Sequence, residues 1–132
     1  MEQEKKNRKS LAVKIKREKD ANCAQAVICA FTDVAGVDEV TAMSLGSGFG
    51  AGMGNGEGTC GAIVGAGIVL GLVKKDKAVA MRDMRNIMSK FQQRNGATQC
   101  KRLKGVGTGC ALRSCDDCVG DAAEFLEELL LL

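Results

Sequence analysis

Hydrophobic residues recur at helical spacing over most of the chain. Within residues 21–36 the apolar positions fall at i, i+4, i+7, i+8 and i+11, one face of an amphipathic helix: Cys23, Val27, Ala30, Phe31 and Val34. Asp20 or Asn22 is a suitable N-cap for this helix, and Gly36 is a typical helix end. The pattern therefore predicts one helix over this stretch.

Two weaker patterns lie on either side of it. Residues 3–19 are helical in pattern but mostly polar, with only a narrow apolar stripe. A short helix is predicted for residues 38–45, with Val40 and Met43 facing inward.

The most hydrophobic helix is predicted for residues 60–73, after Thr59 as N-cap. Because it is apolar nearly all round, we expect it to be central and buried. Gly61 and Gly65 place small residues four positions apart, so another backbone can approach closely. That face would serve either an internal helix pair or a homodimer.

Two longer amphipathic helices complete the chain. The first starts at Asp76 and ends at Gly96, and its apolar face comprises Ala80, Met84, Ile87, Met88 and Phe91. Residues 97–113 are predicted to form a loop. The last helix begins near Ser114, and its apolar face comprises Cys115, Val119, Ala122, Leu126 and Leu129.

Every second residue from Gly46 to Gly58 is glycine. A strand this rich in glycine would lose much entropy and bury little, so we expect a loop, packed through Phe49 and Met53. No segment alternates with period two. The predicted fold is therefore all-α: a single-domain bundle of about five or six helices, with a Gly-rich loop before a buried central helix.

Composition narrows the chemistry. The chain has no histidine, which excludes Ser-His-Asp, Cys-His and His-zinc sites. It has seven cysteines in 132 residues and no signal-peptide pattern at its start. These features favour a reducing compartment, and we expect a cytoplasmic protein. The longest apolar run has 13 residues, against roughly 20 for a membrane span, so no membrane association is expected.

Charge is unevenly distributed. Residues 1–20 hold eight Lys or Arg against four Asp or Glu, whereas residues 115–132 hold six acidic residues and no basic one. A basic arm can bind nucleic acid, but with only four aromatic residues, all Phe, base stacking is poorly supported. We therefore expect residues 1–20 to form a charged helix or arm attracted to the acidic C-terminal helix, and residues 21–132 to form the cysteine-containing domain.

Three of the cysteines lie in the first turn of a predicted helix. They are Cys23, Cys60 and Cys115, which follow Asn22, Thr59 and Ser114. A helix N-terminus carries partial positive charge and free N–H groups, which lower a thiol pKa and favour the reactive thiolate. Cys29 lies on another face of its helix and is interpreted as a packed structural residue.

The sequence Cys115-Asp-Asp-Cys118 is a CxxC motif, the spacing of dithiol redox sites and of half a zinc or iron–sulfur site. Asp116 and Asp117 oppose thiolate formation there. Residues 56–61 satisfy G-x-G-x-x-G, but no strand precedes them, so a dinucleotide site is not supported.

With these residues in view, the chain resembles the C-GCAxxG-C-C family, which is named from its cysteines and described as redox-active. The resemblance covers residues 21–130. It is carried by Asn22-Cys23-Ala24-Gln25-Ala26-Val27, Gly48-Phe49-Gly50-Ala51-Gly52-Met53-Gly54, Thr59-Cys60-Gly61-Ala62-Ile63-Val64-Gly65, Phe91, Gly96, Cys100, Leu103, Cys115 and Val119-Gly120-Asp121-Ala122-Ala123-Glu124. The order Cys60-Gly61-Ala62 departs from the Gly-Cys-Ala of the family name.

The resemblance implies that Cys23, Cys60, Cys100 and Cys115 are the four functional cysteines, with Cys29, Cys110 and Cys118 as additions. In a thiol–disulfide mechanism, Cys60 would attack and Cys23 or Cys115 would resolve the mixed disulfide with a partner protein. The glycine loop would let a bulky partner approach Cys60.

Two alternatives use the same cysteines as ligands. Four thiolates can hold an iron–sulfur cluster for electron transfer, although the spacing is unlike that of compact ferredoxin motifs. They can also hold zinc in a structural Cys₄ site of a non-enzymatic interaction module, with Cys118 as a substitute ligand.

Overall fold

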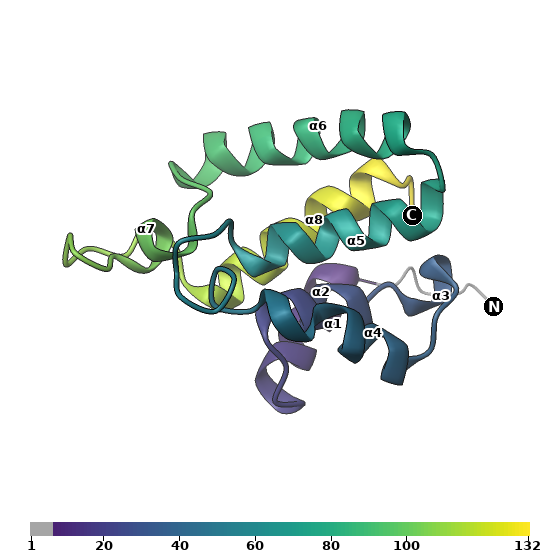
Figure 1. The fold of residues 1–132 in the computed structure, drawn as a ribbon, viewed down its shortest axis with the longest axis horizontal. Helices are drawn as coiled ribbons and strands as arrows, with labels where there is room; N and C mark the ends of the chain where they lie inside the picture. Colours follow the sequence, from purple (N-terminus) through teal and green to yellow (C-terminus); the bar gives the residue numbers. More distant parts are fainter. Residues whose placement is uncertain (1–6) are drawn as a thin grey trace.

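The computed structural model describes residues 7–132 as an all-α fold (Figure 1). The expected all-α class is confirmed. The expected number of five or six helices is too low, because this part of the chain forms eight α-helices and one 3₁₀ turn. The helices are α1 (Arg8–Glu18), α2 (Cys23–Cys29), α3 (Thr32–Ala35), α4 (Glu39–Gly46), α5 (Gly61–Lys74), α6 (Lys77–Asn95), α7 (Cys100–Lys104) and α8 (Cys115–Leu129), and the 3₁₀ turn η1 is Ser47–Phe49. The beginning of the helix predicted for residues 3–19 lies outside the described residues.

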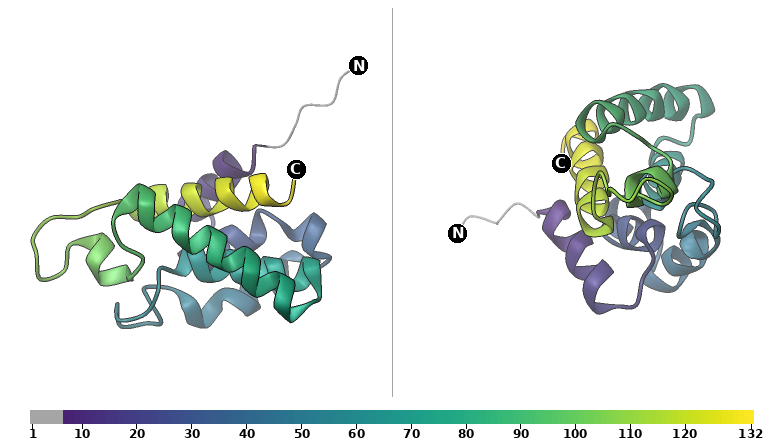
Figure 2. Two further views of the ribbon diagram at one scale, coloured as in Figure 1. Left: turned by 90° about the horizontal axis from the view of Figure 1, so that it is seen from above. Right: turned by 90° about the vertical axis from the view of Figure 1, so that its left-hand side faces the viewer.

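Helices α5 and α8 lie at the centre of the bundle. Helix α6 covers one side of them, and α1, α2 and α4 lie on the other side (Figures 1 and 2). The core between these layers is built from fully buried aliphatic and aromatic side chains, among them Phe31, Leu70, Ile87, Phe91 and Leu126. Helix α7 and the loop after it project from one end, beyond the first turn of α8 (Figure 1).

Helix α5 is buried as predicted, but it begins one residue later. Cys60, rather than Thr59, is the N-cap residue, with φ −48° and ψ 131°. A Cβ at Gly65 would lie 2.7 Å from the backbone oxygen of Ala24, so the α2 backbone packs directly on this glycine. The small-residue face of α5 therefore serves an internal helix pair.

The single helix predicted for residues 21–36 is wrong, because it is divided into α2 and α3. Phe31 interrupts it with φ −128° and is fully buried. The guanidinium of Arg8 donates to the Ala30 carbonyl at 2.9 Å and lies 5.1 Å from the Phe31 ring centroid. A side chain from α1 thus stabilises the break, which a local hydrophobic pattern cannot reveal.

Helix α4 is capped by Asp38, whose side chain accepts from the Thr41 N–H at 2.8 Å. Met43 packs against the core as expected. The inward orientation predicted for Val40 is wrong, since that side chain is 76% exposed and Ala42 is the buried residue. A short helix places few residues inward, and in α4 these are Ala42, which is fully buried, and Met43, which is partly buried.

The two long helices at the end of the chain are confirmed. Asp76 caps α6, Gly96 ends it with φ +82°, and Ser114 caps α8. Within the predicted loop 97–113, however, residues Cys100–Lys104 form the short helix α7.

The Gly-rich segment is a loop, as predicted, and it packs tightly, but not in the expected way. Met53 is 55% exposed and Phe49 is only half-buried. The close contacts come from glycine backbone instead: a Cβ at Gly52 would overlap the Cβ of Cys100, and one at Gly50 would lie 2.6 Å from that of Asn22. The loop therefore lies directly on the segments that carry these residues.

Charge complementarity joins the first and last helices. Lys9 pairs with Glu124 at 3.3 Å and Arg17 with Asp116 at 2.7 Å, so the basic α1 lies along the acidic α8. The division of the chain at residue 20 stays a prediction. In residues 7–132, no helix is both long enough and apolar enough to cross a membrane.

Candidate thiol site

Five of the seven cysteines line one pocket at the end of the bundle where α7 projects. The lining comprises Cys23, Cys60, Cys100, Cys115 and Cys118, together with Ala51, Gly61, Leu103, Lys104 and Arg113. Its free volume is about 20 Å³, which is room for roughly one water-sized atom. All four cysteines singled out from the sequence are therefore brought together, and Cys118 joins them.

Each of those four cysteines stands at the start of a helix. Cys23, Cys100 and Cys115 are the first residues of α2, α7 and α8, and Cys60 is the N-cap of α5. The helix-start positions of Cys23, Cys60 and Cys115 are confirmed, whereas that of Cys100 was missed together with α7. The pocket is thus surrounded by the positive ends of helices.

Capping side chains hold two of these first turns. The side-chain amide oxygen of Asn22 accepts from the Gln25 N–H at 2.8 Å, and the side-chain amide oxygen of Gln25 accepts from the Asn22 N–H at 2.9 Å. This reciprocal pair is a capping box before Cys23. The Ser114 hydroxyl accepts from the Asp117 N–H at 3.1 Å, which orients the first turn of α8.

A short backbone pairing brings Cys60 and Cys100 together. The Cys60 N–H donates to the Thr98 carbonyl at 2.8 Å, and the Cys100 N–H donates to the Gly58 carbonyl at 2.9 Å. This is an isolated antiparallel bridge between Thr59 and Gln99. It ties the end of the glycine loop to the start of α7.

Cys115 and Cys23 form the more accessible thiol pair. A hydrogen bond from the Cys23 thiol, with the positive charges of Lys104 and Lys16, lowers the pKa of Cys115 to about 6, against the opposing effects of burial and Asp116. The same hydrogen bond and burial raise the pKa of Cys23. Both residues are only partly buried. At neutral pH the pair is one thiolate, on Cys115, and one thiol, on Cys23.

Cys60 and Cys118 form a second, enclosed pair, with 5% and 2% of their surfaces exposed. A hydrogen bond from the Cys118 thiol lowers the pKa of Cys60, and the amides of Ala62 and Ile63 at the start of α5 contribute in the same direction. The pKa of Cys118 is raised by that hydrogen bond and by burial. Within this pair the hydrogen bond therefore favours the thiolate form on Cys60 over that on Cys118.

Cys100 belongs to neither pair. It is 5% exposed, and burial raises its pKa although Lys104 acts against this. The pKa of Lys104 is in turn raised, mainly by Cys115. Lys104, which also lines the pocket, is therefore a cation that acts on both Cys100 and Cys115.

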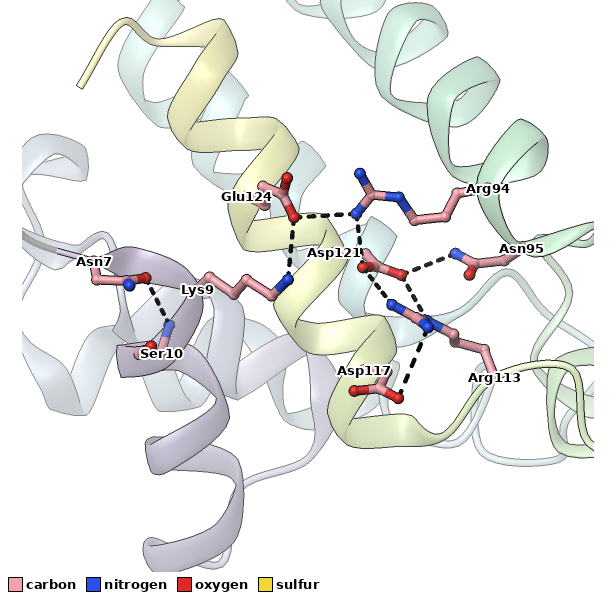
Figure 3. Close-up of polar contacts among 9 residues, drawn as sticks. All are labelled: Asn7, Lys9, Ser10, Arg94, Asn95, Arg113, Asp117, Asp121 and Glu124. Carbon is pink, nitrogen blue, oxygen red and sulfur yellow. Dashed lines mark hydrogen bonds and ion pairs between the residues drawn. The ribbon is translucent and has the colours of Figure 1, made fainter.

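Arg113 also lines the pocket, and its guanidinium is held in place by Asp121 (Figure 3). Its guanidinium donates to both oxygens of Asp121, at 3.0 and 2.9 Å. Asp121 is fully buried and also accepts from Arg94 at 2.9 Å and Asn95 at 3.1 Å. Although burial alone would raise it, these donors hold the pKa of Asp121 below its usual value.

The two remaining cysteines lie away from the pocket. Cys29 ends α2, is half-buried and packs against the core, in agreement with the structural role expected for it. Cys110 is exposed in the loop after α7. Neither lines the thiol site.

None of the seven cysteines forms a disulfide in the structure. Over residues 7–132, no three Cys, Asp or Glu side chains are arranged so that they could hold a metal ion. The pocket cysteines instead face one another in hydrogen-bonded pairs. This arrangement does not fit the Cys₄ zinc or iron–sulfur set expected as an alternative.

Comparison with known families places the chain. The family described as "Putative redox-active protein (C_GCAxxG_C_C)" matches residues 21–129, which include the whole thiol site. The chain belongs to this family, and the resemblance noted from the sequence is confirmed. No curated protein and no solved structure matches the chain.

Proposed function

We propose that this chain is a thiol–disulfide redox protein in which Cys23 and Cys115 are the reacting couple. The observation that carries the proposal is the partly exposed Cys115, whose pKa of about 6 keeps it a thiolate at neutral pH beside a thiol partner. A thiolate that solvent can reach is the attacking species of thiol–disulfide exchange.

The exchange proceeds in two displacements. The Cys115 thiolate attacks one sulfur of a disulfide on a partner protein, which breaks the partner S–S bond and releases one partner sulfur as thiolate. Cys23 loses its proton to that thiolate and attacks Cys115, which expels the second partner sulfur. The partner gains two electrons and ends as one thiol and one thiolate, which takes its proton from water, while Cys23 and Cys115 become a disulfide.

Accessibility favours Cys115 over Cys60 as the attacking group. The sequence favours Cys60 as the attacking group, but this residue is only 5% exposed in the structure. Lys104 and Lys16 further favour the Cys115 thiolate through their charge. A redox partner protein and a reducing, cytoplasmic location remain parts of this proposal.

The test measures reduction of a protein disulfide by the reduced, full-length chain. Every variant carries Cys110→Ser, which removes the exposed thiol outside the pocket. The reduced protein is mixed anaerobically with insulin, and disulfides are mapped by mass spectrometry after acid quenching. We expect one intramolecular disulfide per insulin disulfide reduced, with Cys23–Cys115 as the disulfide found in the earliest samples, and no product from Cys115→Ser.

The same samples are assayed for zinc, iron and sulfide before the reaction. Metal-free protein that forms Cys23–Cys115 supports the proposal. Stoichiometric metal whose removal unfolds the protein, with no disulfide formed, would overturn it in favour of a ligand role for the cysteines.

A further inference from the structure

The pocket contains a second thiol pair that the exchange described above does not use. Cys60 and Cys118 are almost fully enclosed, so a protein partner cannot reach them. They nevertheless line the same pocket as Cys23 and Cys115. Cys118 also lies three residues after Cys115 on α8, so one helix supplies one member of each pair.

From this juxtaposition we infer that the enclosed Cys60–Cys118 pair receives the oxidation from the accessible Cys23–Cys115 pair by internal disulfide exchange. This inference rests on the proposed function. It adds a second redox couple, and with it a place inside the protein where the disulfide is stored away from solvent.

The contacts between the pairs allow the first step. A Cβ at Gly61, the residue after Cys60, would lie 3.4 Å from the Cβ of Cys23, so Cys23 packs against the start of α5. The Cys60 thiolate attacks the Cys23 sulfur of the Cys23–Cys115 disulfide. Cys115 then leaves as a thiolate, which the positive charges of Lys104 and Lys16 favour.

The second step closes the buried disulfide. Cys118, the hydrogen-bond partner of Cys60, gives up its proton by way of the Cys115 thiolate and attacks Cys60. The Cys23 sulfur is expelled and takes that proton, so Cys23 ends as a thiol and Cys115 as a thiolate.

Electrons, protons and charge balance over the two steps. When Cys60 attacks as the thiolate, the four residues comprise one disulfide, the Cys60 thiolate and the Cys118 thiol. After transfer they comprise one disulfide, the Cys115 thiolate and the Cys23 thiol. Each state carries one proton and one negative charge, so the transfer needs no outside oxidant, no outside proton and no charge entering the pocket.

The test follows disulfide positions in time. A Cys29→Ser, Cys110→Ser protein, which retains the five pocket cysteines, is reduced and given one equivalent of diamide, a two-electron thiol oxidant. Samples are acid-quenched at intervals, alkylated and mapped by mass spectrometry. We expect Cys23–Cys115 first and Cys60–Cys118 later in severalfold excess, with Cys115 returning to the alkylatable state.

Two further variants test whether Cys60 is the residue that attacks the Cys23–Cys115 disulfide. Cys60→Ser should stop the sequence at Cys23–Cys115, with no recovery of alkylatable Cys115. Cys100→Ser is the matched control, because Cys100 lines the same pocket but belongs to neither pair, and transfer should persist in it. The time course of the parent protein decides the question even if a pocket variant fails to fold.

The outcomes separate the two ideas. A Cys23–Cys115 disulfide that never moves would overturn the internal transfer and leave the proposed function standing. A Cys115–Cys118 disulfide as the final product would also overturn it, since the pairs would then not be the units that react. Failure to form any disulfide with Cys115 would remove the proposed function itself.

Discussion

Helix α8 carries two anions that the surrounding protein treats in opposite ways. Asp121 is fully buried and accepts four hydrogen bonds, two from Arg113 and one each from Arg94 and Asn95. Cys115, less than two turns earlier, is partly exposed and is stabilised by one thiol donor and by the charges of Lys104 and Lys16. Both groups have lowered pKa values.

The two anions differ in whether a reactant can reach them. The oxygens of Asp121 are enclosed by their donors, so its charge holds α6, α8 and the Arg113 segment together and does no chemistry. The Cys115 sulfur receives enough positive charge to remain a thiolate, yet it is open to the pocket and to solvent. A lowered pKa therefore marks a structural anion in one case and a reactive one in the other.

Replacement of the reactive anion should have the largest effect on chemistry. Cys115→Ser leaves a hydroxyl that cannot form a disulfide, so insulin reduction should fall by about a hundredfold or more. The free energy of unfolding should change by less than about 1 kcal/mol, because the site is partly exposed and the change is small. Thiol assays on samples quenched at fixed times measure insulin reduction, and urea titrations measure the free energy of unfolding.

Cys29→Ser is the matched control for this substitution, because Cys29 is also half-buried but lies outside the pocket. It should retain full insulin reduction. Equal losses in both variants would mean that the assay reports thiol number and not the Cys115 site.

Replacement of the structural anion should act on stability. Asp121→Asn keeps the shape but removes the buried carboxylate that Arg113 and Arg94 share, and we expect a loss of about 2–3 kcal/mol of unfolding free energy in urea titrations. Glu124→Gln, which breaks the half-exposed pairs with Arg94 and Lys9, should lose less than about 1 kcal/mol.

The Asp121 contribution also predicts a pH dependence. Its folded pKa is lowered, so its stabilisation is present above the ordinary Asp pKa of about 3.9 and is lost as pH falls through the folded value. The difference in stability between the parent protein and Asp121→Asn should therefore shrink in acid. A constant difference between pH 7 and pH 3 would contradict the assignment.

Substitutions in the glycine loop can perturb the end of the bundle that carries the pocket cysteines, without changing the contacts of Asp121. A Cβ at Gly52 would overlap the Cβ of Cys100, whereas one at Gly54 meets no atom within 4 Å, and both residues have positive φ. Gly52→Ala should therefore cost about 1–2 kcal/mol more than Gly54→Ala in urea titrations. Equal costs would show that backbone strain alone, and not contact with α7, explains the glycine at position 52.

Local signals were sufficient for much of this fold. Helices α6 and α8 were predicted because the cap residues Asp76 and Ser114 and the apolar faces lie within the helices' own sequence. The break before α3 was not, because it depends on Arg8, 22 residues from the Ala30 carbonyl that it binds. Such a contact has no signature in the pattern of hydrophobic positions.

The cysteines of the candidate site show the same difference between features with a local sequence signal and features that depend on distant residues. Cys23, Cys60 and Cys115 were recognised because a helix start is a local feature. Cys118 was treated as an addition, since its pairing with Cys60 depends on how α8 meets the start of α5. The bridge between Thr59 and Gln99 is too short to give a period-two pattern, so the approach of Cys100 to Cys60 could not be inferred.

The smallest expected effect concerns the charge that keeps Cys115 reactive. In a Cys110→Ser background, alkylation of Cys115 by iodoacetamide should rise with pH around a midpoint of about 6, well below the roughly 8.5 of a free cysteine. Lys104→Gln removes a nearby positive charge, and because Lys104 is exposed, water screens its effect. We expect the midpoint to move upward by roughly half a pH unit.

Lys101→Gln is the matched control on the same short helix, because Lys101 pairs with Glu57 at 2.8 Å and is not among the charges that act on Cys115. Its midpoint should stay at that of the parent protein. If Lys104→Gln also leaves the midpoint unchanged, the hydrogen bond from Cys23 is the main cause of the lowered pKa of Cys115. Cys23→Ala, which removes the donor, should then shift the midpoint more than any charge substitution. In that case Cys115 would resemble Asp121 more closely, as an anion defined by its direct donors.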